Sequence, residues 1–91
     1  MPEVLFTIEL PDGAQKQCYS PSSIVREYFA EGEELAVAEF LQRSREAYAQ
    51  ASERVRAKYG FSCSSAASQL ADIEQMTRAF PREAVVRILS I

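Results

Sequence analysis

The feature that most constrains the fold is a long run of apolar residues at helical spacing, from about Leu35 to Tyr59. Steps of three and four residues put these side chains on one face of an α-helix. Gly60 follows the run and predicts its C-terminal end. A helix of this length must bury its apolar face against other elements of the chain. The stripe consists of Val37, Phe40, Leu41, Ser44, Tyr48, Ala51, Val55 and Tyr59.

The two ends of the chain read as β-strands. From Val4 to Leu10, every second residue is apolar, and the residues between them are of mixed character. The stretch is rich in β-branched and aromatic side chains. The turn sequence PDG at 11–13 and the weaker stretch from Ala14 to Tyr19 predict a hairpin. The stretch from Ala84 to Ile91 is too apolar for a strand exposed on both faces. We expect this last strand to lie beside the first one, covered by the helices.

Two further helices are predicted on either side of the long one. The first begins at the serine-rich stretch 20–23 and ends near Gly32. The second begins within 62–65 and ends before Pro81. The element order is then β-β-α-α-α-β. We expect a single α+β domain over residues 1–91, with a small sheet of about three strands packed against two to three helices.

Composition narrows the range of possible activities. The 91 residues contain no histidine and only two cysteines, so histidine-based catalysis and the common zinc sites are excluded. No catalytic residue, metal site or cofactor is predicted. The net charge of −3 disfavours nucleic acid and anionic membranes as partners. The start of the chain has no signal-like segment and no apolar run is long enough to span a membrane, so we expect a cytoplasmic protein.

A basic run lies on the long predicted helix. At 100° per residue, some of its members flank the apolar stripe on one side and the rest on the other. Arginine suits carboxylates and phosphates, so the run is a candidate partner-binding surface. The alternative, which the pattern favours, is a solvated face of a partly buried helix. The members are Arg43, Arg45, Arg54, Arg56 and Lys58.

The cysteines are candidate reactive thiols. Cys18 closes the second predicted strand, and Cys63 precedes the start of a predicted helix, where a thiol pKa is lowered. The alternative is that both are small buried hydrophobic side chains, and it is favoured because no base lies nearby in the sequence.

Several stretches resemble a small bacterial family of nitrogen starvation response proteins. The most specific is ASERVRAKYGF at 51–61, and PDG at 11–13, CYSPS at 18–22, FLQRSREA at 40–47 and CS at 63–64 add to it. The resemblance covers most of the chain. It implies a small single-domain protein of unknown molecular function, encoded beside a nitrilase, a radical-SAM protein and a flavin-dependent oxidoreductase. It supplies no catalytic residue.

Three functional hypotheses follow from these observations. The first is a non-enzymatic accessory protein of nitrogen acquisition from nitriles or cyanide, which binds a larger enzyme encoded in the same cluster or forms a homodimer. The second is a small thiol-dependent enzyme or carrier that uses Cys63 with Cys18. The third is a module that senses a small nitrogen metabolite.

Overall fold

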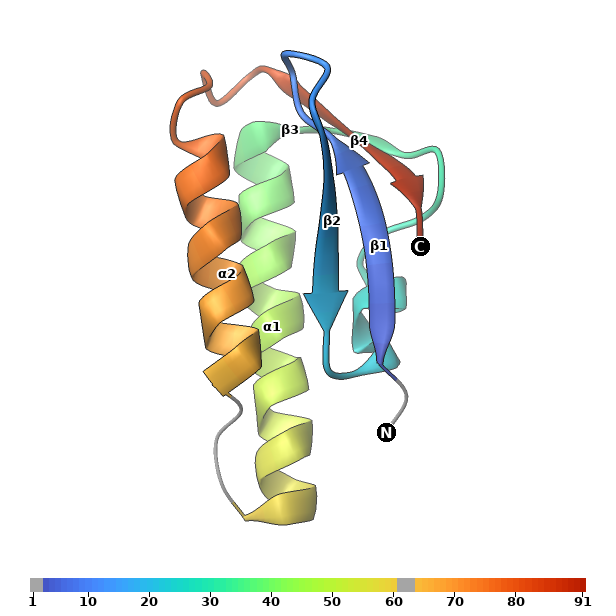
Figure 1. The fold of residues 1–91 in the computed structure, drawn as a ribbon, viewed down its shortest axis with the longest axis vertical. Helices are drawn as coiled ribbons and strands as arrows, with labels where there is room; N and C mark the ends of the chain where they lie inside the picture. Colours follow the sequence, from blue (N-terminus) through green and yellow to red (C-terminus); the bar gives the residue numbers. More distant parts are fainter. Residues whose placement is uncertain (1–2, 61–63) are drawn as a thin grey trace.

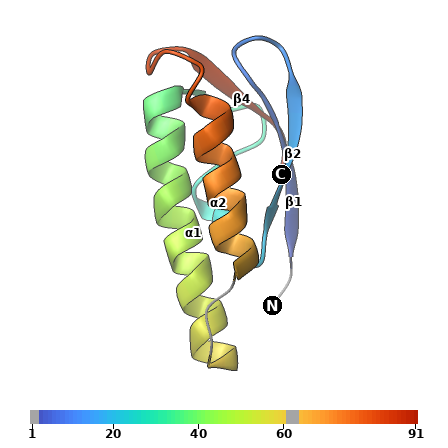
Figure 2. The ribbon, with the colours of Figure 1, turned by 60° about the vertical axis from the view of Figure 1, so that its left-hand side comes forward.

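The computed structural model describes residues 3–60 and 64–91 and has two layers, a four-stranded antiparallel sheet and two helices. The helices α1 (Val37–Tyr59) and α2 (Ser64–Thr77) run side by side over one face of the sheet (Figures 1 and 2). The strand order is β2-β1-β4-β3. The strands are β1 (Val4–Glu9), β2 (Gln15–Ser20), β3 (Glu34–Ala36) and β4 (Val85–Ser90).

The hairpin and the position of the last strand are as the sequence predicts. Strands β1 and β2 pair antiparallel around the turn at 11–13, where Gly13 takes a positive φ of 90°. Strand β4 lies beside β1 with Ile8 opposite Ile88. The alternate residues Val4, Phe6 and Ile8 are buried beneath the helices, whereas Leu5 on the other face is 58% exposed. Burial of one face of the sheet therefore fixes the register of β1.

The first predicted helix is wrong. The segment holds only a 3₁₀ turn, η1 (Ser23–Glu27), which begins after Ser22, whose side chain accepts a hydrogen bond from the N–H of Ile24 at 3.3 Å. The Ser20 hydroxyl donates to the carbonyl of Ser22 at 2.8 Å. These local bonds hold the chain in a tight turn, which is the usual competition between serine side chains and regular helix. Ile24 and Val25 are still buried, so the apolar pattern of this segment indicates buried side chains although no α-helix forms.

The prediction of three strands is also wrong, because the start of the predicted long helix is strand β3. Gly32, at a φ of 83°, donates its N–H to the carbonyl of Ile88, and the N–H of Ile88 donates to the carbonyl of Glu33. These bonds place β3 against the outer edge of β4, and α1 then begins at Val37. The observed order is β-β-3₁₀-β-α-α-β. Three residues are too few to show strand periodicity in the sequence.

The core lies between the helices and the inner face of the sheet. Phe29 brings β1 and α1 together, because its ring lies 6.0 Å from that of Phe6 and 5.4 Å from that of Phe40, centroid to centroid. The apolar stripe of α1 is buried as predicted from Val37 to Val55, except that Leu41 is only partly buried, whereas Tyr59 is 53% exposed. The helix ends at Gly60, whose N–H donates to the carbonyl of Arg56 at 2.7 Å. Helix α2 adds Ala66, Ile73 and Thr77 to the core.

Candidate functional site

The five basic residues of the predicted surface divide into two groups. Arg43 is bonded to other residues of the protein. Its guanidinium donates to the carbonyl of Tyr28 at 3.0 Å and pairs with the carboxylates of Glu33 at 2.9 Å and Glu39 at 2.8 Å. The hydrogen bonds to Glu39 and Glu33 raise the pKa of Arg43 above its ordinary value. Arg43 therefore fastens the segment before β3 to the first turns of α1 and has little capacity left for a partner.

Arg45 also has a partner within the chain. Its guanidinium pairs with the carboxylate of Glu74 on α2 at 3.0 Å. Both side chains are exposed, so this ion pair contributes little to stability but keeps the charge neutralised. Arg43 and Arg45 thus lie on opposite flanks of α1, as the 100° spacing predicts, and each joins α1 to a different neighbour.

Arg54, Arg56 and Lys58 form the second group, which we call the basic end of α1. All three are exposed, and no carboxylate of residues 3–60 and 64–91 forms an ion pair with any of them. The last turns of α1 reach beyond the strands and beyond the start of α2 (Figures 1 and 2). The Lys58 ammonium lies 5.5 Å from the ring centroid of Tyr59. Cations in the last turn of a helix interact favourably with the helix dipole. This interaction is the structural role of Arg56 and Lys58.

A shallow depression adjoins the basic end of α1. It is lined by residues on one flank of the helix, Gln50, Glu53, Arg54 and Ala57, and has a volume of about 280 Å³. Gln50 itself hydrogen-bonds to the hydroxyl of Tyr28, so the depression lies on the side of η1. Its mixed charge and small size suit contact with a protein surface better than enclosure of a small molecule.

Cys18 is buried in the core and does not resemble a reactive thiol. It is 1% exposed, and burial, with a smaller effect of the Asp72 carboxylate, raises its pKa to about 12. At neutral pH the thiol is protonated, and the thiolate is the nucleophile. Cys63 lies outside the described residues, so its distance from Cys18 is not defined. The position of Cys18 favours the interpretation as a small buried hydrophobic side chain.

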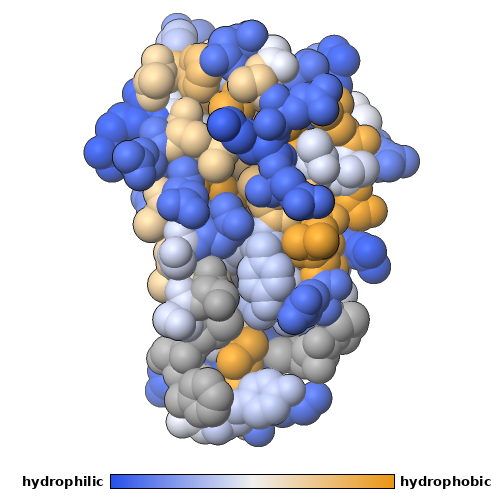
Figure 3. All heavy atoms as spheres, viewed as in Figure 1, coloured by the Kyte–Doolittle hydropathy of each residue, from blue (hydrophilic) through white to orange (hydrophobic). Residues whose placement is uncertain are grey.

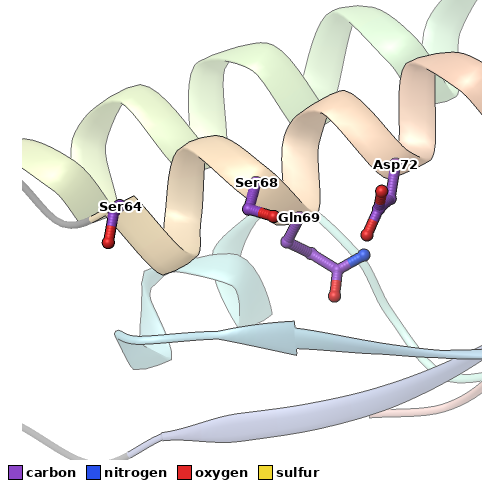
Figure 4. Close-up of a pocket in the computed structure, with 4 residues that line it drawn as sticks. All are labelled: Ser64, Ser68, Gln69 and Asp72. Atoms are coloured by element: carbon purple, nitrogen blue, oxygen red, sulfur yellow. The ribbon is translucent and has the colours of Figure 1, made fainter.

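A groove beside α2 was not anticipated from the sequence. It has a volume of about 510 Å³ and is lined by Ser64, Ser68, Gln69 and Asp72, which follow one another along one face of the helix (Figure 4). Ser64, Ser68 and Asp72 recur every four residues in the sequence. That spacing was the available signal.

Neither a metal site nor a membrane helix is found in the part of the chain that the structure describes. Within it, no three cysteine or acidic side chains are grouped closely enough to hold a metal ion. None of its helices combines the length and the apolar character that crossing a bilayer requires.

Comparison with known proteins identifies the family. No curated protein and no solved structure matches the chain significantly. The model of one protein family, described as nitrogen starvation-induced protein NitG, matches residues 5–91. The match covers the β1–β2 hairpin, both helices and β4, and it confirms the resemblance carried by residues 51–61. The chain belongs to the family of the nitrogen starvation-induced protein NitG.

Proposed function

We propose that the chain is a non-enzymatic accessory protein of the bacterial nitrogen-starvation response that binds an acidic surface of a larger enzyme through the basic end of α1. The enzyme is one encoded beside it and used to acquire nitrogen from nitriles or cyanide, in the cytoplasm. The observation that carries the proposal is the contrast within the basic run. Arg43 and Arg45 have carboxylate partners in the fold, whereas Arg54, Arg56 and Lys58 have none among the described residues.

The chemistry of this end suits a protein partner. Arginine and tyrosine are the residues that most often dominate binding energy at interfaces, and Tyr59 is 53% exposed beside the three cations. Complementary charge speeds association and selects the partner. The chain as a whole is acidic, so a local cluster of unpaired cations is a specific feature and not a reflection of overall charge.

The alternatives have less support. A thiol-dependent activity would need a reactive cysteine, and Cys18 is buried with a raised pKa. A homodimer would need a self-complementary surface, and the three large exposed hydrophobic residues of the described chain, Leu5, Tyr59 and Val85, lie on different elements. On the face drawn in Figure 3, hydrophobic atoms form small areas separated by hydrophilic ones. No extended apolar patch of the kind that marks a permanent dimer is seen there.

The test is capture of a partner by charge-matched variants. The reduced protein is immobilised and exposed to a lysate of nitrogen-starved cells, and the bound proteins are identified by mass spectrometry. The variant R54E/R56E reverses the basic end of α1. The control R78E/R82E makes the same change of charge at exposed residues that have no ion pair among the described residues, in the connection between α2 and β4.

We expect the wild type and the control to recover one cluster-encoded enzyme in stoichiometric amount. We expect R54E/R56E to recover it about tenfold less, because charge reversal at an interface turns attraction into repulsion. Binding of the purified enzyme should also weaken as salt is raised. Equal recovery by both variants, or recovery of no enzyme, would contradict the proposal.

A further inference from the structure

Strand β2 is an edge strand with one neighbour, and its other side lies beside α2, whose Gln69 hydrogen-bonds to it. In an antiparallel pair, the N–H and C=O groups of alternate residues point to the neighbour and away from it. The N–H of Leu10 donates to the carbonyl of Ala14 at 2.8 Å, and the pairs of Lys16 with Ile8 and of Cys18 with Phe6 follow at steps of two. The odd-numbered residues of β2 therefore direct their backbone groups away from β1.

Tyr19 confirms this direction, because both of its backbone groups bond to side chains of the helices. Its N–H donates to Oε1 of Gln69 on α2 at 3.1 Å, and its carbonyl accepts from the hydroxyl of Tyr48 on α1 at 2.6 Å. Gln15 and Gln17 have the same orientation. No group of residues 3–60 and 64–91 is hydrogen-bonded to the outward N–H or C=O of either one. The outward backbone groups of β2 are therefore hydrogen-bonded at Tyr19 and have no partner among the described residues at Gln15 and Gln17. We call these two residues the open part of the edge.

The open part of the edge is accompanied by an unpaired carboxylate. Figure 4 shows Gln69 and Asp72 projecting from α2 toward β2. Asp72 follows Gln69 by three residues, and Gln69 bonds to the N–H of Tyr19, so both side chains project from the face of α2 that is turned toward β2. No basic side chain of the described residues forms an ion pair with Asp72. The free side of β2 thus carries the open backbone groups of Gln15 and Gln17, and α2 adds a negative charge beside it at Asp72.

We propose that this edge binds an extended peptide segment of another protein, which adds as a fifth strand beside Gln15 and Gln17 and places a lysine or arginine side chain against Asp72. Backbone hydrogen bonds provide affinity in strand addition, and alternate side chains provide specificity. A segment residue opposite Cys18 projects to the same face as Cys18, which is the face that α2 covers. That residue is the one that meets the carboxylate.

A second copy of the chain fits this edge poorly. Antiparallel pairing of Gln15 with Gln17 of a second copy would place Lys16 directly opposite Lys16 of that copy, and like charges in that position repel. Each copy would also bring its own α2 along the shared edge (Figure 1). A lone extended segment avoids both conflicts.

The test uses random nine-residue peptides displayed on phage, selected against the intact protein. We expect the recovered peptides to share one basic position flanked by residues that favour β-strands. The variant Q17P removes the outward N–H and leaves the ladder to β1 intact, because edge positions that face away from a neighbour tolerate proline. The variant D72K reverses the charge in the groove at an exposed helix position.

We expect the selected peptides to bind Q17P and D72K at least about tenfold more weakly than wild type. They should bind R54E/R56E as tightly as wild type, which separates this proposal from the function proposed for the basic end of α1. Amide exchange at Gln17 should slow when peptide is added. If Q17P does not fold, D72K and the exchange measurement decide the question.

Three results would overturn the proposal. One is a selection that enriches no peptide. Another is a set of peptides that bind D72K and wild type equally. The last is slowing of exchange at Gln17 by raised protein concentration alone, which would mean that a second copy occupies the edge.

Discussion

Ser44 is the one polar side chain that the described core leaves without a hydrogen-bond partner. It lies on the buried face of α1, is 0% exposed, and its Oγ has no partner. A buried hydroxyl without a partner loses its bonds to water and gains none in return. The sequence places Ser44 on the apolar stripe but does not reveal whether its hydroxyl is satisfied.

Replacement of Ser44 by alanine should therefore stabilise the protein. S44A removes the unsatisfied hydroxyl and improves helix propensity, so we expect the free energy of unfolding to rise by about 0.5–1 kcal/mol. The measurement is chemical denaturation of S44A beside S52A, which makes the same exchange at a half-buried position of α1 and gains only the propensity. A loss of stability in S44A would show that the hydroxyl has a partner.

We expect the folded protein to be destabilised at alkaline pH, because Cys18 and Tyr48 are buried. Burial raises the pKa of the Cys18 thiol from about 9.0 to about 12, and it also raises the pKa of the Tyr48 phenol. Below pH 9 the thiol is protonated in both the folded and the unfolded protein, so its contribution to the free energy of unfolding is fully present. Between pH 9 and 12 the unfolded chain binds fewer protons than the folded chain, and stability falls as pH rises.

The size of the effect can be measured by difference. One thiol contributes a slope of about −1.4 kcal/mol per pH unit in that window. Unfolding free energies of wild type and C18A at pH 8 to 11 should therefore converge as pH rises, because the variant lacks the thiol. Parallel curves for the two proteins would mean that Cys18 is accessible to solvent.

At the scale of elements, Arg43 joins the segment before β3 to α1. Its bonds to Tyr28, Glu33 and Glu39 hold this segment against the start of α1. We expect R43M to lower the free energy of unfolding by about 1 kcal/mol, a modest value because the guanidinium is 30% exposed. The control R54M should leave stability unchanged within experimental error. Equal effects of both would indicate that the three bonds of Arg43 contribute nothing.

Gln69 joins α2 to the edge of the sheet. Its Oε1 accepts the outward N–H of Tyr19, which closes one position of an edge that otherwise invites pairing. In Q69A we expect amide exchange at Tyr19 to accelerate by about tenfold or more, since its protecting acceptor is lost. Exchange at Phe6, within the β1–β2 ladder, serves as the internal control. Unchanged exchange at Tyr19 would show that Gln69 is not its acceptor in solution.

At the scale of the whole molecule, stability and partner binding should respond differently to salt. The four ion pairs of the described chain are all partly exposed, so their contribution to folding is small and the apolar core provides most of the stability. Raising salt from 0.05 to 0.5 M should change the free energy of unfolding by less than about 1 kcal/mol. The same change should markedly weaken binding at the basic end of α1. Strong salt dependence of folding would show that the ion pairs support the fold.

The elements that the sequence determines are those with strong local signals. Helical spacing and Gly60 define α1 to within two residues at its start, and alternation defines β1 and its hairpin with β2. The apolar character of 84–91 correctly places β4 beside β1. Family membership likewise follows from stretches such as residues 51–61. Each of these signals depends on neighbours along the chain or on how apolar a segment is.

Only the tertiary structure decided the rest. Strand β3 exists because Gly32 and Glu33 bond to Ile88, far along the chain, and the helix predicted at 20–32 gives way to a 3₁₀ turn held by serine side chains. The basic run looks uniform in the sequence, yet Arg43 and Arg45 differ from the rest because Glu33 and Glu74 lie beside them in space. Pairing of strands and of charges joins residues that are distant in sequence, and local periodicity carries no information about it.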